Sequence, residues 1–304
     1  MLSICIPVFN QDVTHLVHVL HNQLDNLGVT AEIMVMDDGS DDDIREVNRS
    51  VQSLQLVRLI ELPENIGRSK IRNLLAERAT YGWLLYLDCD TLIINRDFIK
   101  KYLAYCQNGT VVCGGHVYSS EPPGSKYILH WKAGTKREVR ALSFRQANPY
   151  HAFMTGNFLI KRDMFDTIKF HEDLEGYGHE DTLFAFELKQ AGVAITHIDN
   201  PILHKGLEES DQFLQKTREG LRNLHHIYIK TKEDQTFAGM SRVLDMYRRI
   251  SAMRLAGLLG FTFKICKRQF ERNLHGNRPS LMCFDLYKLG MFHLVGKSTS
   301  CQDI

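Results

Sequence analysis

The first 90 residues alternate short, mostly apolar runs with longer segments of helical periodicity. The apolar runs are 2–8, 33–36, 56–62 and 83–87, and each predicts a strand. Between them, apolar side chains recur at helical spacing over 13–27, 44–54 and 68–80. Strands that are apolar on both faces are typical of a parallel sheet covered by helices on both sides. The pattern therefore predicts an α/β fold of the Rossmann-like kind, with a mostly parallel central sheet flanked by helices.

The rest of the chain is less regular. Residues 111–117, 157–160 and 193–198 predict further strands, 180–191 predicts a helix, and 119–152 predicts a long connecting segment. From residue 207 onward the sequence becomes helical and basic. We therefore expect a catalytic domain over 1–206 and a mostly helical C-terminal extension over 207–304.

The charge supports this division. Residues 1–204 contain 20 Lys/Arg and 26 Asp/Glu, a net charge of −6, whereas residues 205–304 contain 17 and 10, a net charge of +7. The total of +1 argues against nucleic-acid binding. Seven cysteines without a CxxC pair argue against a disulfide framework and a structural zinc site. No signal peptide or long apolar run is evident, so a cytoplasmic location is expected.

Two acidic clusters follow predicted strands. Asp37 and Asp38 come after the second strand, and Asp88 and Asp90, separated by Cys89, come after the fourth. Ligands of parallel sheets bind beyond the carboxyl ends of the strands, where these clusters would meet. Carboxylate oxygens suit Mg²⁺ or Mn²⁺, which share their remaining positions between water and phosphate. The alternative for the Asp-x-Asp triplet is a solvated turn.

The third predicted helix begins with three cations. Arg68, Lys70 and Arg72 follow Gly67, and a basic helix N-terminus suits an anionic diphosphate. A solvated basic face is the alternative. The Asp38 carboxylate can accept a hydrogen bond from a base or ribose. The alternative for this turn is that Ser40 and Asp41 cap the helix that begins at residue 42.

Three further positions complete the candidate site. Asp181 would lie at the N-terminus of helix 180–191, which favours the ionised form that a catalytic base needs, and Tyr177 would present its ring to a sugar. Ordinary N-terminal helix charge is the alternative. His204 follows the last strand and is a candidate third metal ligand, although a lone histidine is more often structural.

Together, these residues resemble those of glycosyltransferase family 2, the inverting enzymes of the glycosyltransferase A (GT-A) fold. Residues 177–181 also look like the Trp-Gly-Gly-Glu-Asp block of galactosyl- and chondroitin-type transferases, with tyrosine in place of tryptophan. His204 matches the histidine that binds metal in several of those enzymes. The blocks that carry the resemblance, in the family's order, are 3–10, 37–40, 65–67 with 72–73, 87–90, and 156–160 preceding 178–181.

The resemblance implies a metal-dependent transfer from a nucleotide sugar, with UDP as the expected nucleotide, to a hydroxyl of a glycan or lipid-linked acceptor in polysaccharide biosynthesis. Asp181 would be the base, with Glu180 holding donor or acceptor hydroxyls and Tyr177 on the acceptor side. The metal, Mn²⁺ or Mg²⁺, would be bound by Asp90, by Asp88 partly through ribose or water, and by His204. The implied donor-binding residues are Pro7, Val8, Phe9, Asp38, Asn65, Gly67, Arg68, Lys70, Arg72, Asp88, Gly156 and Asn157.

Two other function classes fit the sequence less well. A sugar-nucleotide nucleotidyltransferase usually has a glycine-rich loop with Arg and Lys after its first strand, but residues 7–12 contain no glycine. A non-catalytic nucleotide-sugar or glycan-binding module would not need the acidic triplet together with Glu180 and Asp181.

The resemblance does not extend to the basic C-terminal part. Residues 253–270 combine apolar side chains with a cluster of cations, and 280–297 predicts a second helix of this kind. Peripheral attachment of 253–297 to the inner face of an anionic membrane is one interpretation. A helix pair packed on the catalytic domain or on a second subunit is the other.

Overall fold

The computed structural model describes residues 1–106, 111–174 and 176–297, and the chain divides into two compact units. The first unit comprises 1–119, 139–174 and 187–206, and the second comprises 120–138, 175–186 and 207–304. The predicted boundary after residue 206 is one limit between them. Two earlier segments, however, group with the C-terminal region. Residues 298–304 of the predicted extension lie outside the described residues.

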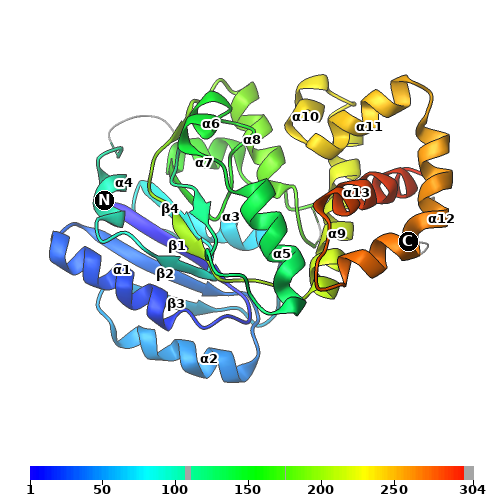
Figure 1. Cartoon of the computed structure of the whole chain (residues 1–304). Coiled ribbons are helices and arrows are strands. Elements are labelled where there is room, and N and C mark those ends of the chain that lie inside the picture. Colours follow the sequence, from blue (N-terminus) through cyan, green and yellow to red (C-terminus); the bar gives the residue numbers. More distant parts are fainter. Residues whose placement is uncertain (107–110, 175, 298–304) are drawn as a thin grey trace. The chain divides into compact units, whose positions relative to one another are not determined.

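The first unit is built on a seven-stranded sheet with the order β3-β2-β1-β4-β8-β6-β9 (Figure 1). Strands β1 to β4 run parallel to one another, β8 is antiparallel to both of its neighbours, and β6 and β9 are parallel. The predicted mostly parallel sheet is therefore confirmed. The strands are β1 Leu2–Val8, β2 Ala31–Asp37, β3 Val57–Glu61, β4 Trp83–Leu87, β6 Val111–Cys113, β8 Asn157–Lys161 and β9 Ile195–His197.

Helices cover both faces of this sheet. On one face, alternate residues of β1 such as Ile4 and Ile6 pack in one hydrophobic core with Val17 and Leu20 of α1. On the other face, the ring of Tyr86 stacks on Phe165 of α7, with ring centroids 5.4 Å apart. The helices of this unit are α1 Thr14–Leu27, α2 Asp42–Arg49, α3 Arg68–Arg78, α4 Phe98–Leu103, α6 Leu142–Ala147 and α7 Arg162–Ile168.

A small second sheet was not predicted. It has the order β5-β10-β7, and its strands are β5 Thr91–Ile93, β7 His116–Val117 and β10 Ile202–His204. Strands of two or three residues are too short to show a periodicity in the sequence. Strand β10 pairs antiparallel with β5, and the register places His204 opposite Thr91. This sheet therefore brings His204 to the residue that follows Asp90.

Residues 119–152 were expected to form a long connection, but they contain two helices. Helix α5, Ile128–Ala133, lies in the second unit and buries side chains such as Leu129 and Ala133, and α6 lies in the first unit.

The second unit is helical. Helix α8, Glu180–Gln190, begins in the second unit and ends in the first. The other helices of the second unit are α9 Ser210–Lys230, α10 Gln235–Met240, α11 Arg242–Ala252, α12 Ala256–Leu274 and α13 Leu281–Val295. Within the described residues, no helix is both long and apolar enough to cross a bilayer.

One buried amide offers a test of the first unit. Asn200 is fully buried, its Nδ2 donates to the Phe98 carbonyl at 3.0 Å, and its Oδ1 accepts from Asn95 Nδ2 at 3.1 Å. We expect Asn200→Ala to lower the free energy of unfolding by about 2 kcal/mol, because it leaves buried partners unpaired. Urea unfolding measures this. The exposed Asn26→Ala is the control and should change it by less than about 0.5 kcal/mol. Equal losses would contradict the account.

Candidate functional site

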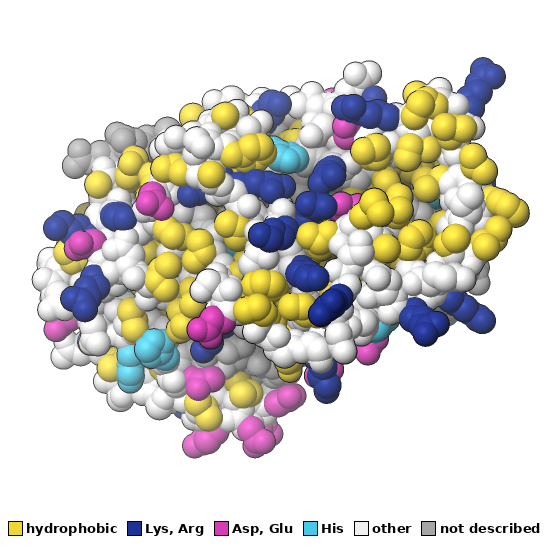
Figure 2. All heavy atoms as spheres, viewed as in Figure 1, with side chains coloured by type: hydrophobic (Ala, Val, Ile, Leu, Met, Phe, Trp, Pro, Cys, Tyr) yellow, Lys and Arg dark blue, Asp and Glu magenta, His cyan; other side chains and the backbone are white. Residues whose placement is uncertain are grey.

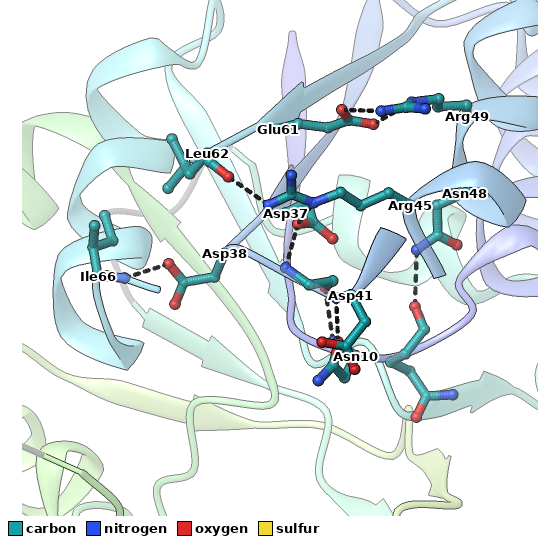
Figure 3. Close-up of polar contacts among 12 residues, drawn as sticks. Asn10, Asp37, Asp38, Asp41, Arg45, Asn48, Arg49, Glu61, Leu62 and Ile66 are labelled. Carbon is teal, nitrogen blue, oxygen red and sulfur yellow. Dashed lines mark hydrogen bonds and ion pairs between the residues drawn. The ribbon is translucent and has the colours of Figure 1, made fainter. Parts of the chain in front are cut away.

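Strand β2 ends in two acidic residues with different tasks. Asp37 forms an ion pair with Arg45 at 3.3 Å, and Arg45 Nη2 donates to the Leu62 carbonyl at 2.8 Å. Figure 3 shows Arg45 lying between Asp37 and Leu62. Asp37 therefore ties the end of β2 to α2 and to the chain that leaves β3.

Asp38 instead holds the start of α3. One carboxylate oxygen accepts a hydrogen bond from the backbone N–H of Ile66 at 2.7 Å (Figure 3). The other accepts from the backbone N–H of Gly67 at 3.1 Å. Burial raises the pKa of Asp38, and these two donors oppose that rise. The expected contact of Asp38 with a nucleobase stays a prediction. The structure shows that Asp38 positions the loop carrying Asn65 and Gly67.

Helix capping by Ser40 is not the arrangement found. Ser40 Oγ accepts a hydrogen bond from the backbone N–H of Asn10 at 2.8 Å, and Asp41 is the N-cap residue of α2. Asn10 in turn accepts from the Asp41 N–H through its side chain, at 2.8 Å. The turn after β2 is thereby joined to the turn after β1, where Phe9 is half exposed and Val8 is buried.

Asp88, the first acid of the triplet, is paired with a buried cation. Arg72 Nη2 donates to Asp88 Oδ1 at 2.7 Å, and the Arg72 side chain is only 3% exposed. A Cβ at Gly156 would lie 2.6 Å from Asp88 Oδ2, so Gly156 leaves room for the carboxylate. Arg72 was expected to face ribose or diphosphate. In the structure its buried guanidinium is paired with Asp88, and its contact with the nucleotide stays a prediction.

Asp90, the second acid, lies beside His204. His204 Nδ1 is 3.4 Å from Asp90 Oδ1, and the Lys205 N–H donates to the Asp90 carbonyl at 2.8 Å. Burial opposes ionisation of Asp90, but His204 and Arg68 outweigh it and hold the pKa of this carboxyl below its usual value. A Cβ at Gly206 would lie 1.9 Å from Asp90 Oδ2. Gly206 was not predicted, although a glycine two residues after His204 was the available signal.

The Asp90 and His204 pair fits part of a metal site. Asp90 Oδ1 is buried and accepts no hydrogen bond of good geometry, since His204 Nδ1 lies 3.4 Å away, so the oxygen is available as a metal ligand. Across the described part of the chain, however, no three His, Cys, Asp or Glu side chains are grouped so that they alone hold a metal ion. Mg²⁺-type ions are commonly bound by one or two protein groups and completed by substrate phosphates and water. The residues present fit such an incomplete site, with Asp88 turned to Arg72.

The cations of α3 are distributed unevenly. Arg68 lies close enough to Asp90 and Cys89 to lower the pKa of both groups, whereas Lys70 is exposed. Burial nevertheless raises the pKa of the Cys89 thiol to about 12, so the central residue of the triplet is neutral. Arg68 is therefore the cation of α3 whose charge favours the ionised form of Asp90.

Asn157 is held by hydrogen bonds within the first unit, and its place in a sugar site stays a prediction. Its Nδ2 donates to the carbonyls of Gly115, at 2.8 Å, and Asn200, at 3.0 Å. Its Oδ1 accepts from the Tyr102 hydroxyl at 2.6 Å. Because the amide is buried and these bonds occupy it on both sides, Asn157 fastens β8 to the neighbouring loops. Gly156 beside it makes space for Asp88.

The second unit holds the predicted base. Asp181 lies in the first turn of α8, where its Oδ1 accepts from the Thr182 N–H at 2.6 Å and from the Thr182 hydroxyl at 3.2 Å. Glu180 is buried, and its Oε2 accepts from the Gly178 N–H at 3.1 Å. These three donors and the helix N-terminus favour the carboxylate forms.

Two residues around this turn, His179 within it and Lys216 beside Tyr177, were not assigned a role from the sequence. Burial lowers the pKa of His179 to about 4, so this imidazole is neutral, and its Nδ1 lies 3.1 Å from the Thr182 hydroxyl. Lys216 Nζ lies 5.1 Å from the centre of the Tyr177 ring, which is 39% exposed. Lys216 is 39 positions further along the chain than Tyr177, so no local pattern indicated this cation–π contact.

Known structures support the fold. The mannosyltransferase PcManGT from Pyrobaculum calidifontis, in complex with GDP-Man and Mn²⁺, aligns with a TM-score of 0.54 and 14% identity over 98% of this chain and 88% of its own. Glucosyl-3-phosphoglycerate synthase from Mycobacterium tuberculosis, in complex with Mn²⁺, UDP and glucosyl-3-phosphoglycerate, aligns with a TM-score of 0.51 and 17% identity over 74% and 78%. These similarities concern the fold, and they confirm the predicted GT-A architecture.

The sequence comparisons concern the family. An uncharacterized glycosyltransferase of Haemophilus influenzae is 26% identical over 178 residues, which are 57% of this chain and 68% of that protein. The profile described as "Glycosyl transferase family 2" matches residues 3–169, more than half of the 304 residues. This range includes the ends of β1, β2 and β4 and the triplet itself. The chain therefore belongs to glycosyl transferase family 2.

Proposed function

We propose that this family 2 glycosyltransferase moves a sugar from a nucleoside diphosphate sugar to an acceptor hydroxyl, with inversion at the anomeric carbon. The observation that carries the proposal is the buried Asp90 oxygen that accepts no hydrogen bond of good geometry, 3.4 Å from His204 Nδ1 at the carboxyl edge of the sheet. An ionised oxygen that is not fully paired can bind a cation, and family membership supports the reaction class.

Asp90 and His204 would hold Mn²⁺ or Mg²⁺ through one oxygen and one nitrogen. When bound, the ion neutralises charge on the departing diphosphate. Two solved structures of the same fold are complexes with Mn²⁺ and UDP or GDP-Man, which supports this assignment. Arg68, already near Asp90, adds a second positive charge for the diphosphate. Asp88 then serves the ribose or a bound water more readily than the ion, because Arg72 occupies its Oδ1.

Asp181 would take the proton of the attacking hydroxyl. The hydrogen bonds from Thr182 and the N-terminus of α8 favour the ionised carboxylate, which is the form that a base needs before the attack. The oxygen–proton bond of the acceptor breaks as its oxygen bonds to the anomeric carbon, while the bond to the diphosphate oxygen breaks. A single displacement inverts that carbon. Glu180, bonded to Gly178, would position the turn that carries Tyr177.

The donor and acceptor classes can be inferred in the same way. We infer a UDP sugar as donor and a glycan or lipid-linked acceptor at the cytoplasmic face of a membrane, as part of polysaccharide synthesis. Tyr177 supports the acceptor class, because its exposed ring beside Lys216 offers a stacking surface for a sugar with a cation next to it. Family membership favours transfer over nucleotidyl transfer or binding without catalysis.

Binding of the nucleotide is expected to depend on the metal ion. In a thermal-shift panel, UDP with Mn²⁺ should raise the melting temperature by roughly 5 °C at a concentration about 100 times its Kd, and UDP with EDTA should have little effect. Arg68→Gln should weaken UDP about tenfold, because it removes a charge-assisted contact. Arg96→Gln, an exposed arginine of the same unit, is the control and should bind as wild type. The proposal fails if no nucleoside diphosphate stabilises the protein in a metal-dependent way.

Replacement of the Asp181 carboxylate tests its assignment as the base. We expect Asp181→Asn to lower kcat for transfer by a factor on the order of 10³, with Mn²⁺-dependent UDP binding unchanged. Release of UDP from a panel of UDP sugars and acceptors measures the first quantity, and thermal shift measures the second. Asp211→Asn replaces another acid in the first turn of a helix and should leave both unchanged. Full transfer by Asp181→Asn would assign the base elsewhere.

A further inference from the structure

Exposed hydrophobic side chains gather on α12 in the second unit. Leu258, Phe261 and Ile265 are 58%, 65% and 61% exposed. Figure 2 shows hydrophobic side chains grouped over α11 and α12, with Lys and Arg at the edges of the group. The three residues are spaced by three and four positions, so they lie on one side of the helix. We call this side the outer face of α12.

The opposite side of α12 already packs on α13. Phe263 and Leu274 are buried there. The contact is close, because a Cβ at Gly290 would lie 2.1 Å from Phe263, and a Cβ at Gly260 would lie 2.4 Å from His293. At about 100° per residue, the outer face lies half a turn away from these residues. Helix α12 is therefore held by its inner side, and the outer face is not needed for its packing.

Positive charge surrounds the outer face. Residues 253–278 contain six Lys/Arg and one Asp/Glu, a net charge of +5. Arg268 and Arg272 follow Ile265 at intervals of three and four positions, so they continue the same face toward the end of the helix. Both are exposed. The outer face is thus apolar in its first half and basic in its second.

We propose that the outer face of α12 binds the surface of an anionic lipid bilayer, with Leu258, Phe261 and Ile265 inserted below the headgroups. Arg268 and Arg272 would contact lipid phosphates in the same plane. A face that is apolar in one half and basic in the other matches this interface, where buried apolar area and attraction to anionic lipid act together. A second copy of the chain is a poorer partner, because it would bring a net charge of +5 against another +5. This inference does not depend on the proposed reaction.

Vesicle flotation tests the proposal with the full chain. Wild type should float with vesicles of phosphatidylcholine mixed with phosphatidylglycerol, bind pure phosphatidylcholine much less, and dissociate as salt rises. F261S/I265S should bind the mixed vesicles at least about tenfold more weakly, because it removes inserted apolar area. R268E/R272E should lose the preference for the anionic lipid.

Matched variants separate the face from general effects. Ile229→Ser removes an isoleucine that is 53% exposed on α9, and R78E/K100E changes the net charge as R268E/R272E does. Both should float as wild type, and all variants should keep the wild-type Tm. The proposal is overturned if wild type floats with neither vesicle or equally with both, or if F261S/I265S floats as wild type. It is also overturned if sedimentation finds a wild-type dimer that F261S/I265S dissociates, since the face would then bind a second copy.

Discussion

The parallel pairing of β1 with both β2 and β4 is the constraint on which the candidate site depends. It brings three strand ends to one edge of the sheet, so the turns after residues 8, 37 and 87 must lie side by side. Backbone and side-chain bonds then join these turns. Asp38 binds the loop before α3, and Arg72 of the same helix binds Asp88. The position of α3 is therefore fixed by one acidic residue from β2 and by another from β4.

This arrangement gives the two acids of the triplet different chemistry. Asp88 faces a buried guanidinium, which compensates its charge within the protein. Asp90 has a low pKa and a buried oxygen that accepts no hydrogen bond of good geometry, with His204 and Arg68 as its nearest charges. A carboxylate that is kept ionised but not fully paired is suited to an external cation. Gly206 keeps one side of that carboxylate free of any Cβ, which explains a glycine after β10.

The sequence was sufficient for the sheet and for the position of the acids relative to strand ends, because apolar runs and turn residues are local signals. It did not identify side-chain partners. Arg72 was assigned to a phosphate and pairs with Asp88, and Asn157 was assigned to a sugar and bonds to Gly115 and Asn200. These partners lie 16 to 43 positions away in the chain. The small sheet around His204 was missed for the same reason, since its pairing is entirely non-local.

The central claim is that Asp90, rather than the triplet as a whole, binds the metal that accompanies the nucleotide. Electron paramagnetic resonance of Mn²⁺ tests it directly, because the free ion gives a signal that bound ion loses. We predict that the free-ion signal falls when wild type and UDP are both present, and that Asp90→Asn weakens this binding by more than about tenfold. Asp97→Asn, an exposed acid nearby in the chain, should bind as wild type. Equal Mn²⁺ binding by Asp90→Asn and wild type in the presence of UDP would contradict the account.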